Sequence, residues 1–193
     1  MLDPVPDLFG GRFPDAFRAE VRTQLTDLGV ELLLGSGLRQ PPPTPPGVAG
    51  RFSVQTAAGT TVTADVWFAC YGGAAQGGTL AAPGERVAVT PELRVRGHDT
   101  LFAIGDVTDV PEMKMAATAN AHAGVVAANV TALVEGRALT AHEPHPAGIV
   151  LPLGPKGGAS YAPDLGVLGA EATTDIKGDL FVEMYRDLLG VTP

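Results

Sequence analysis

The chain has 193 residues, of which 45 % are hydrophobic and 18 % charged, a composition that predicts folded domains rather than a disordered chain. The formal net charge of −8 argues against a nucleic-acid-binding function, because such proteins use clustered Lys and Arg to neutralise phosphates. The lone cysteine, Cys70, excludes an internal disulfide or a two-cysteine redox pair and fits a reducing cytoplasm.

The sequence predicts neither a membrane-spanning helix nor a signal peptide. No stretch approaches the roughly 20 apolar residues that cross a bilayer, and the first residues lack the basic and apolar regions of a signal peptide. We therefore expect a cytoplasmic protein, with peripheral contact at the inner face of the membrane as an addition. Because the sequence starts only a few residues before its first helix, we also expect that its opening domain lies elsewhere.

The first third of the chain predicts a helix followed by short strands. Apolar residues spaced by three and four predict a helix over 14–28, and a strand follows over 30–34. Five prolines within 39–46 predict an extended connector. Alternating apolar and polar residues then predict a β-hairpin, made of 51–56 and 60–64.

The middle of the chain predicts further strands and one slender helix. Residues 65–70 are almost all apolar, which predicts a strand covered on both faces with Cys70 buried at its end. Three more strands are expected, at 86–89, 93–96 and 100–104. An alanine-rich helix is predicted over 114–135, with Gly136 as its cap.

The last part of the chain predicts a small α+β region. Strands are expected at 148–153 and 159–161, around a glycine-rich loop, and a closing helix over 174–189. That helix carries an apolar stripe, which we interpret as core, with an interfacial membrane face as the alternative. The stripe consists of Ile176, Leu180, Phe181, Met184 and Leu188.

The stretch 100–123 carries the clearest chemical signal. An apolar strand ends at Gly105 and Asp106, and a helix rich in small residues begins soon afterwards. Ligands of open α/β sheets bind beyond the carboxyl ends of strands, and a helix start there offers unpaired N–H groups. Asp106 is therefore a candidate for accepting hydrogen bonds from sugar hydroxyls, the alternative being that it only caps a turn.

This stretch resembles the FAD-dependent pyridine-nucleotide oxidoreductases, in which an apolar strand, an A-x-G-D motif, a short loop and a helix form the second FAD-binding segment. The match is Ala103-Ile104-Gly105-Asp106. The resemblance implies that Gly105 and Asp106 approach the ribityl chain of FAD. It also implies that the helix start, at Lys114, Met115 and Ala116, faces the isoalloxazine ring.

Over nearly its whole length the chain looks most similar to apoptosis-inducing-factor-like NAD(P)H:quinone reductases and type II NADH dehydrogenases. The features that carry this are the G-D-V-x-D-V turn, the P-x-x-K-M-A helix start and the closing D-L-F-V. The implied fold class is α/β: a partial two-dinucleotide-binding-domain fold with incomplete Rossmann-like sheets and a β-hairpin, plus a small α+β C-terminal domain. The implied domains are 1–72, the remnant of the NAD(P)H-binding domain, 73–140, the FAD-binding segment, and 141–193, the C-terminal domain.

The chain departs from the family pattern at two points, and these limit how much of the FAD and NAD(P)H sites it can form. Tyr71 stands where relatives carry a small residue, and no G-x-G-x-x-G phosphate-binding motif occurs. The resemblance thus implies the C-terminal half of an FAD-dependent enzyme that passes electrons from NAD(P)H through FAD to a quinone-like acceptor. The alternative is a truncated, non-catalytic module that needs a partner chain carrying the glycine motifs, or a second copy of itself.

We interpret the remaining histidines and their acidic neighbour as structural residues. His142, Glu143 and His145 are expected in a solvated loop rather than around a metal, since no second cluster accompanies them. His122 is expected to pack or hydrogen-bond within the long helix, and His98 to lie in a turn. No catalytic residue is assigned, although the resemblance places Lys156 near the flavin edge or the quinone.

Overall fold

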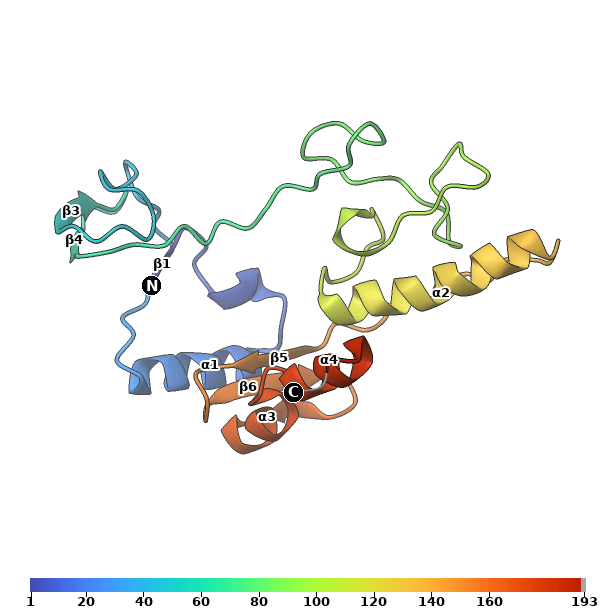
Figure 1. Ribbon diagram of the computed structural model, residues 1–193. Helices are drawn as coiled ribbons and strands as arrows, with labels where there is room; N and C mark the ends of the chain where they lie inside the picture. The colour runs from blue at the N-terminus through green and yellow to red at the C-terminus, as the bar shows by residue number, and fades with distance from the viewer. Residues whose placement is uncertain (192–193) are drawn as a thin grey trace. The chain divides into compact units, whose positions relative to one another are not determined.

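A computed structural model describes residues 1–191, which form two compact units. The first unit combines Met1–Cys70 with Gly148–Pro193, of which the last two residues lie outside the described part, and the second is Tyr71–Ala147. Figure 1 shows the ribbon of both units. The expected domain boundaries at 72 and 140 stay predictions.

In the first unit, a helix and a small sheet share an apolar core. Helix α1 (Asp15–Asp27) lies against strand β6 (Gly158–Ala162), which pairs on either side with β5 (Ile149–Pro152) and β7 (Gly166–Leu168) in an antiparallel sheet. The apolar stripe of α1 that the sequence predicts is buried at Phe17 and Val21. Phe17 packs among other aromatic rings, with its centroid 5.5 Å from that of Phe9 and 5.2 Å from that of Phe13.

Short elements complete this unit. Strand β1 (Leu2–Asp3) pairs in parallel with β2 (Leu33–Leu34), and a 3-10 helix spans Leu8–Gly11. The predicted hairpin is confirmed as β3 (Phe52–Gln55) and β4 (Thr61–Ala64), in antiparallel register.

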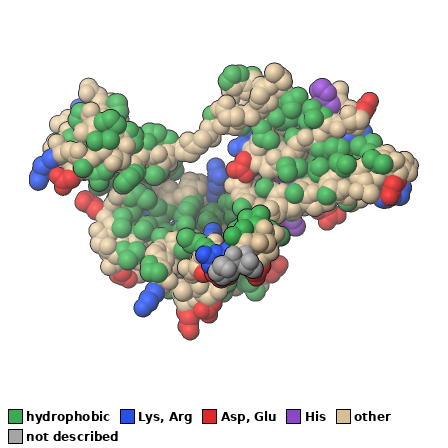
Figure 2. Space-filling model, viewed as in Figure 1, with side chains coloured by type: hydrophobic (Ala, Val, Ile, Leu, Met, Phe, Trp, Pro, Cys, Tyr) green, Lys and Arg blue, Asp and Glu red, His purple; other side chains and the backbone are tan. Residues whose placement is uncertain are grey.

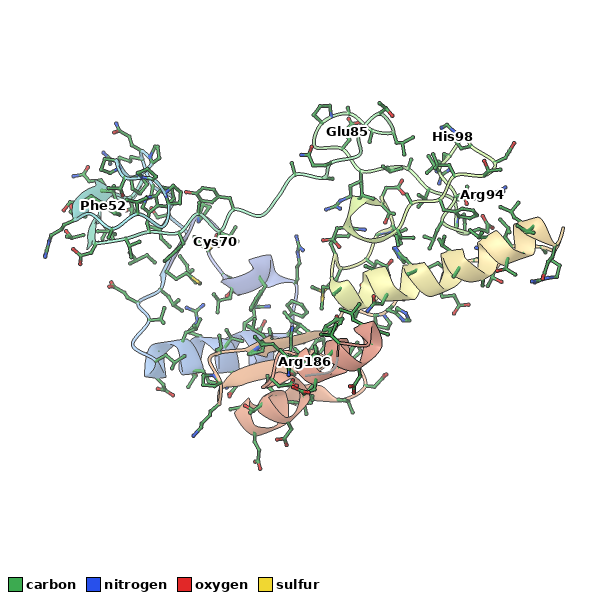
Figure 3. The ribbon with its side chains drawn as sticks, in the orientation of Figure 1. Phe52, Cys70, Glu85, Arg94, His98 and Arg186 are labelled. Atoms are coloured by element: carbon green, nitrogen blue, oxygen red, sulfur yellow. The ribbon has the colours of Figure 1, made fainter. Side chains whose placement is uncertain are left out.

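The expected buried strand at 65–70 is wrong. These residues run as an extended chain whose Asp65 and Trp67 carbonyls accept N–H groups from Gly50 and Gly47, beside the proline-rich connector. Phe68 is 72 % exposed, and Cys70 is exposed rather than buried. Figure 3 shows Cys70 on this chain after the hairpin. An apolar run becomes a doubly covered strand only where neighbouring strands flank it, and the described residues provide none here.

The single closing helix is also wrong, because two helices form. Helix α3 (Ala170–Lys177) ends at Gly178, and α4 (Val182–Leu189) starts after Leu180 and Phe181 adopt left-handed backbone angles. The Asp179 side chain accepts the Phe181 N–H at 2.8 Å, a local bond that competes with helix continuation. The expected apolar stripe is therefore divided, and Leu180, Met184 and Leu188 are exposed rather than core. Figure 2 shows apolar side chains on the visible surface.

The second unit is built on loops packed against one helix. Helix α2 (Ala116–Val134) begins two residues later than predicted, and Gly136 follows it with a positive φ as expected for a cap. The expected strands at 86–89, 93–96 and 100–104 form only isolated bridges, with Val89 opposite Val95 and Arg94 opposite Phe102. Their apolar side chains still make the core of the unit, which consists of Val87, Val89, Leu93 and Val95. Within residues 1–191, no helix has the length and apolar character that crossing a membrane would take.

Candidate functional site

A tight turn presents Asp106 at the surface of the second unit. Gly105–Val107 form a 3-10 turn in which Gly105 has a φ of 71°, a left-handed conformation that favours glycine. A Cβ atom on Gly105 would lie 3.2 Å from the Cβ of Ala119 on α2, so glycine also allows the turn to approach the helix closely. Asp106 itself is exposed, and the Arg86 guanidinium donates to its backbone carbonyl.

The start of α2 lies next to this turn in sequence and contacts it in space. Met115 stands at the N-cap in an extended conformation and offers no side-chain cap, so the first N–H groups of the helix have no side-chain acceptor there. Such a helix start attracts electron-rich atoms. Ala116 and Ala117 are exposed, and their small side chains add little bulk around the helix start.

Lys114 precedes the helix start and is partly buried. Its Nζ donates to the Val110 carbonyl at 2.6 Å. Burial lowers the pKa of Lys114, and the charge of Arg86 adds to this, while the carboxylates of Glu112, Asp106 and Asp109 oppose it. The five expected cofactor-binding residues, Gly105, Asp106, Lys114, Met115 and Ala116, thus all lie within the second unit.

Lys156 is exposed in the loop between β5 and β6 of the first unit, and its functional role stays a prediction.

Behind the turn, three buried side chains form a hydrogen-bonded group that we call the His–Glu–His cluster: His122, Glu112 and His142. The His122 Nε2 lies 2.5 Å from Oε1 of Glu112, and the His142 Nε2 lies 3.0 and 3.2 Å from its two oxygens. The three side chains are at most 4 % exposed. His122 is therefore a hydrogen-bonding residue, as predicted, and its partners Gly105 and Glu112 both lie outside α2.

The residues of the His142-Glu143-Pro144-His145 loop differ in burial and in hydrogen bonding. The expectation of a solvated loop is wrong for His142, which is buried because Glu112 supplies the acceptor that its ring needs. Glu143 is exposed as expected. The His145 amide donates to Glu112 at 3.3 Å, and the rings of His142 and His145 lie 5.9 Å apart, edge to face. His98 lies in an exposed turn, as expected (Figure 3).

The three side chains of the cluster also have the spacing of a metal centre, since one ligand atom from each lies within 4.8 Å of the others. Their hydrogen bonds indicate another arrangement. The Gly105 N–H donates to His122 Nδ1 at 2.9 Å, so that nitrogen carries a lone pair and the proton of the neutral ring is on Nε2, directed at Glu112. A metal on Nε2 would move the proton to Nδ1, where it would oppose the Gly105 N–H.

The charge of Glu112 is stabilised by these donors. Burial alone raises the pKa of Glu112, but hydrogen bonds from His122, His142 and the His145 amide outweigh it, and the pKa lies below its ordinary value of 4.5. A carboxyl group whose pKa is lowered in the folded protein stabilises the fold at pH values above its ordinary pKa. This stabilisation is lost as the pH falls through the lowered pKa.

We therefore expect the free energy of unfolding to fall as the pH drops below about 4.5, and to fall less steeply in Glu112→Gln, which cannot ionise. Chemical denaturation of both proteins between about pH 7 and about pH 3 measures the two slopes. Parallel curves for the two proteins would contradict the assignment of this acid sensitivity to Glu112.

Sequence reasoning proposed Asp106 and the helix start as cofactor-binding residues, a role that stays a prediction, and it did not single out Glu112. Its sequence context, Val110-Pro111-Glu112-Met113, shows only an acidic residue in a loop. The one available signal was indirect: a histidine in an apolar helix needs a polar partner, and Glu112 lies ten residues from His122.

Comparison with known proteins gives consistent results, although no protein-family model matches the chain. It is 32 % identical over 140 residues to the FAD-dependent oxidoreductase FVFD30 of Flammulina velutipes, covering 69 % of this chain and 40 % of that protein. It is 33 % identical over 146 residues to ferroptosis suppressor protein 1 of Homo sapiens, covering 71 % of this chain and 39 % of that protein. The chain thus spans about two fifths of the length of these relatives.

Solved structures show the same fold. An FAD-dependent pyridine nucleotide-disulphide oxidoreductase from Desulfovibrio vulgaris matches with a TM-score of 0.62 at 17 % identity, over 82 % of this chain and 41 % of its own. The water-forming NADH oxidase of Lactobacillus brevis matches with a TM-score of 0.61 at 17 % identity, over 82 % of this chain and 36 % of its own. The chain therefore has part of a two-dinucleotide-binding-domain fold, as predicted.

Proposed function

Because the chain belongs to the FAD-dependent pyridine-nucleotide oxidoreductase superfamily and corresponds to part of such a protein, we propose that it forms the C-terminal half of an NAD(P)H oxidoreductase and supplies one side of its FAD site. FAD, when bound, would carry electrons from NAD(P)H to a quinone-like acceptor. Within the chain, Asp106 would accept hydrogen bonds from the ribityl hydroxyls. The start of α2 would offer its N–H groups to the oxygen and nitrogen atoms of the flavin ring.

One observation carries this proposal: an exposed carboxylate on a glycine turn adjoins a helix start that has no side-chain cap. The turn offers acceptors and the helix offers donors, which is the pair that a polyhydroxylated chain attached to a heteroaromatic ring requires. The exposed alanines at the helix start permit close approach of a flat ring. Lys114 beside them adds positive charge, which suits an electron-rich ring edge.

Replacing Asp106 by alanine tests the proposal. Losing hydrogen bonds to a charged acceptor costs about 1.5–3 kcal/mol, so the Kd for FAD should rise about 10- to 100-fold. Titration of the chain with FAD, followed by flavin fluorescence and by the visible spectrum after dialysis, measures the change. Asp99→Ala is the matched control, since Asp99 is exposed in the same unit and no role is proposed for it. Equal FAD affinity for the two variants would refute the assignment of Asp106.

A second candidate function follows from the missing G-x-G-x-x-G motif, whose glycines let the backbone approach a pyrophosphate. In this version the chain is a non-catalytic module that gains FAD binding only with a partner chain carrying the glycine motifs, or in a homodimer. A chain that stays colourless with FAD alone but retains it after mixing with such a partner would favour this candidate over the first.

Peripheral membrane contact at the inner face of the membrane belongs to the same proposal. Support comes from α4, where Met184, Leu188 and Leu189 are exposed on a short helix that also carries Arg186. An apolar face flanked by a basic residue is typical of interfacial helices.

A further inference from the structure

His122 is a fully buried polar residue that the proposed function leaves unused. Its ring is 0 % exposed in a helix that is otherwise rich in alanine. A buried imidazole is stable only if its ring nitrogens find partners. Both nitrogens do: Nε2 faces Glu112, and Nδ1 accepts the backbone N–H of Gly105.

The direction of these bonds is fixed at one end. A backbone N–H can only donate, so Nδ1 of His122 must be the acceptor and Nε2 must carry the proton. The Glu112 carboxylate accepts that proton's hydrogen bond and is itself held by His142 and the His145 amide. Since His142 is also anchored through its own N–H to the Pro91 carbonyl at 2.8 Å, the acceptor for His122 has a fixed place.

The other end of the chain of bonds is the turn that precedes Asp106. The Gly105 N–H is bound by His122 at 2.9 Å, and the Gly105 carbonyl accepts the Thr108 hydroxyl at 2.9 Å. Both polar groups of this one peptide residue are therefore held by buried side chains. The direction in which the chain leaves Gly105 determines where the Asp106 carboxylate stands.

We propose that His122 is a positioning residue: its Nδ1, oriented by the Glu112–His142 pair, holds the Gly105 N–H and so fixes the turn that presents Asp106 to FAD. This inference rests on the proposed function of Asp106. His122 does not touch the cofactor in this scheme, and its effect passes through the backbone of Gly105.

Two substitutions of His122 separate its two hydrogen bonds. In His122→Asn, the side-chain oxygen takes the place of Nδ1 and can accept the Gly105 N–H, but nothing reaches Glu112. In His122→Gln, the side-chain NH₂ takes the place of Nε2 and can donate to Glu112, but the acceptor for Gly105 is lost. Both variants remove the ring and one of its two hydrogen bonds, so a purely structural role predicts similar behaviour for both.

Hydrogen exchange of the Gly105 amide, relative to amides inside α2, reports the positioning directly and needs no FAD. We expect exchange roughly tenfold faster in His122→Gln and close to the parent rate in His122→Asn, as the loss of one hydrogen bond implies. The Kd for FAD should follow the same order, rising roughly tenfold only in His122→Gln. Equal exchange at Gly105 in the two variants would overturn the proposal.

Asp106→Ala in the same titration separates this inference from the function on which it rests. If Asp106→Ala weakens FAD binding while both His122 variants bind like the parent, the positioning role is wrong and the proposed function stands. If Asp106→Ala binds FAD like the parent, the proposed function is wrong. The proposed effect of His122 on FAD binding is then wrong as well. The exchange rate at Gly105 then still decides whether Nδ1 holds the turn.

Discussion

Glu112→Ala is expected to lower the free energy of unfolding by about 3 kcal/mol, because it leaves two buried donors, the rings of His122 and His142, without their acceptor. Glu112 accepts from the rings of His122 and His142 and from the His145 amide. Each unsatisfied buried donor costs about 1–3 kcal/mol, and relaxation of the His145 loop recovers part of the sum. Urea unfolding followed by far-UV circular dichroism, to which the 19-residue α2 contributes, measures the loss.

Glu143→Ala is the matched control for this prediction. Glu143 follows His142 directly but is exposed, and substitutions at such surface positions change stability by about 0.5 kcal/mol or less. If Glu112→Ala and Glu143→Ala unfold at the same urea concentration, the His–Glu–His cluster does not stabilise the second unit. A loss confined to Glu112→Ala would show that the loop after α2 is held by this carboxylate.

Phe17→Ala should cost about 3–5 kcal/mol in the first unit, the range for removing a fully buried aromatic side chain. The Phe17 ring is 0 % exposed and packs against Phe9 and Phe13 at centroid distances of 5.5 and 5.2 Å. Alanine would leave a cavity that the backbone of α1, held to the sheet by Gln24, closes only in part. Thermal and urea unfolding measure the cost.

Leu28→Ala serves as the control, since Leu28 follows the same helix but is 61 % exposed. Its removal should change the free energy of unfolding by about 0.5 kcal/mol or less. A cost for Phe17→Ala close to that of Leu28→Ala would contradict the view that the aromatic group is the core of this unit.

Local patterns predicted the elements that depend on local chemistry. The 3.6-residue period around Phe17 and Val21 identified α1, and the alternation on either side of Gly59 identified the β3–β4 hairpin, because both elements satisfy their own backbone bonds. The residues from Gly105 to Ala116 could be proposed as a site because a motif links them along the chain, and their role in binding FAD stays a prediction.

Elements that need distant partners were not predicted correctly. The apolar run at 65–70 has the sequence of a central strand, but a strand requires neighbours, and the sequence of one segment does not contain them. Glu112 was missed for the same reason: its partners His122 and His142 lie 10 and 30 residues away. The break between α3 and α4 depends instead on a local competitor, the Asp179 side chain, which apolar periodicity does not detect.

The pairing of α1 with β6 has a consequence for synthesis on the ribosome. The Gln24 side chain donates to the Gly158 carbonyl and accepts the Gly158 N–H, across 134 residues of chain. Translation runs from the N-terminus, so α1 emerges long before β6, the strand that it contacts, and the whole second unit emerges in between. The second unit, which is continuous in sequence, can therefore fold before α1 gains its contact with β6.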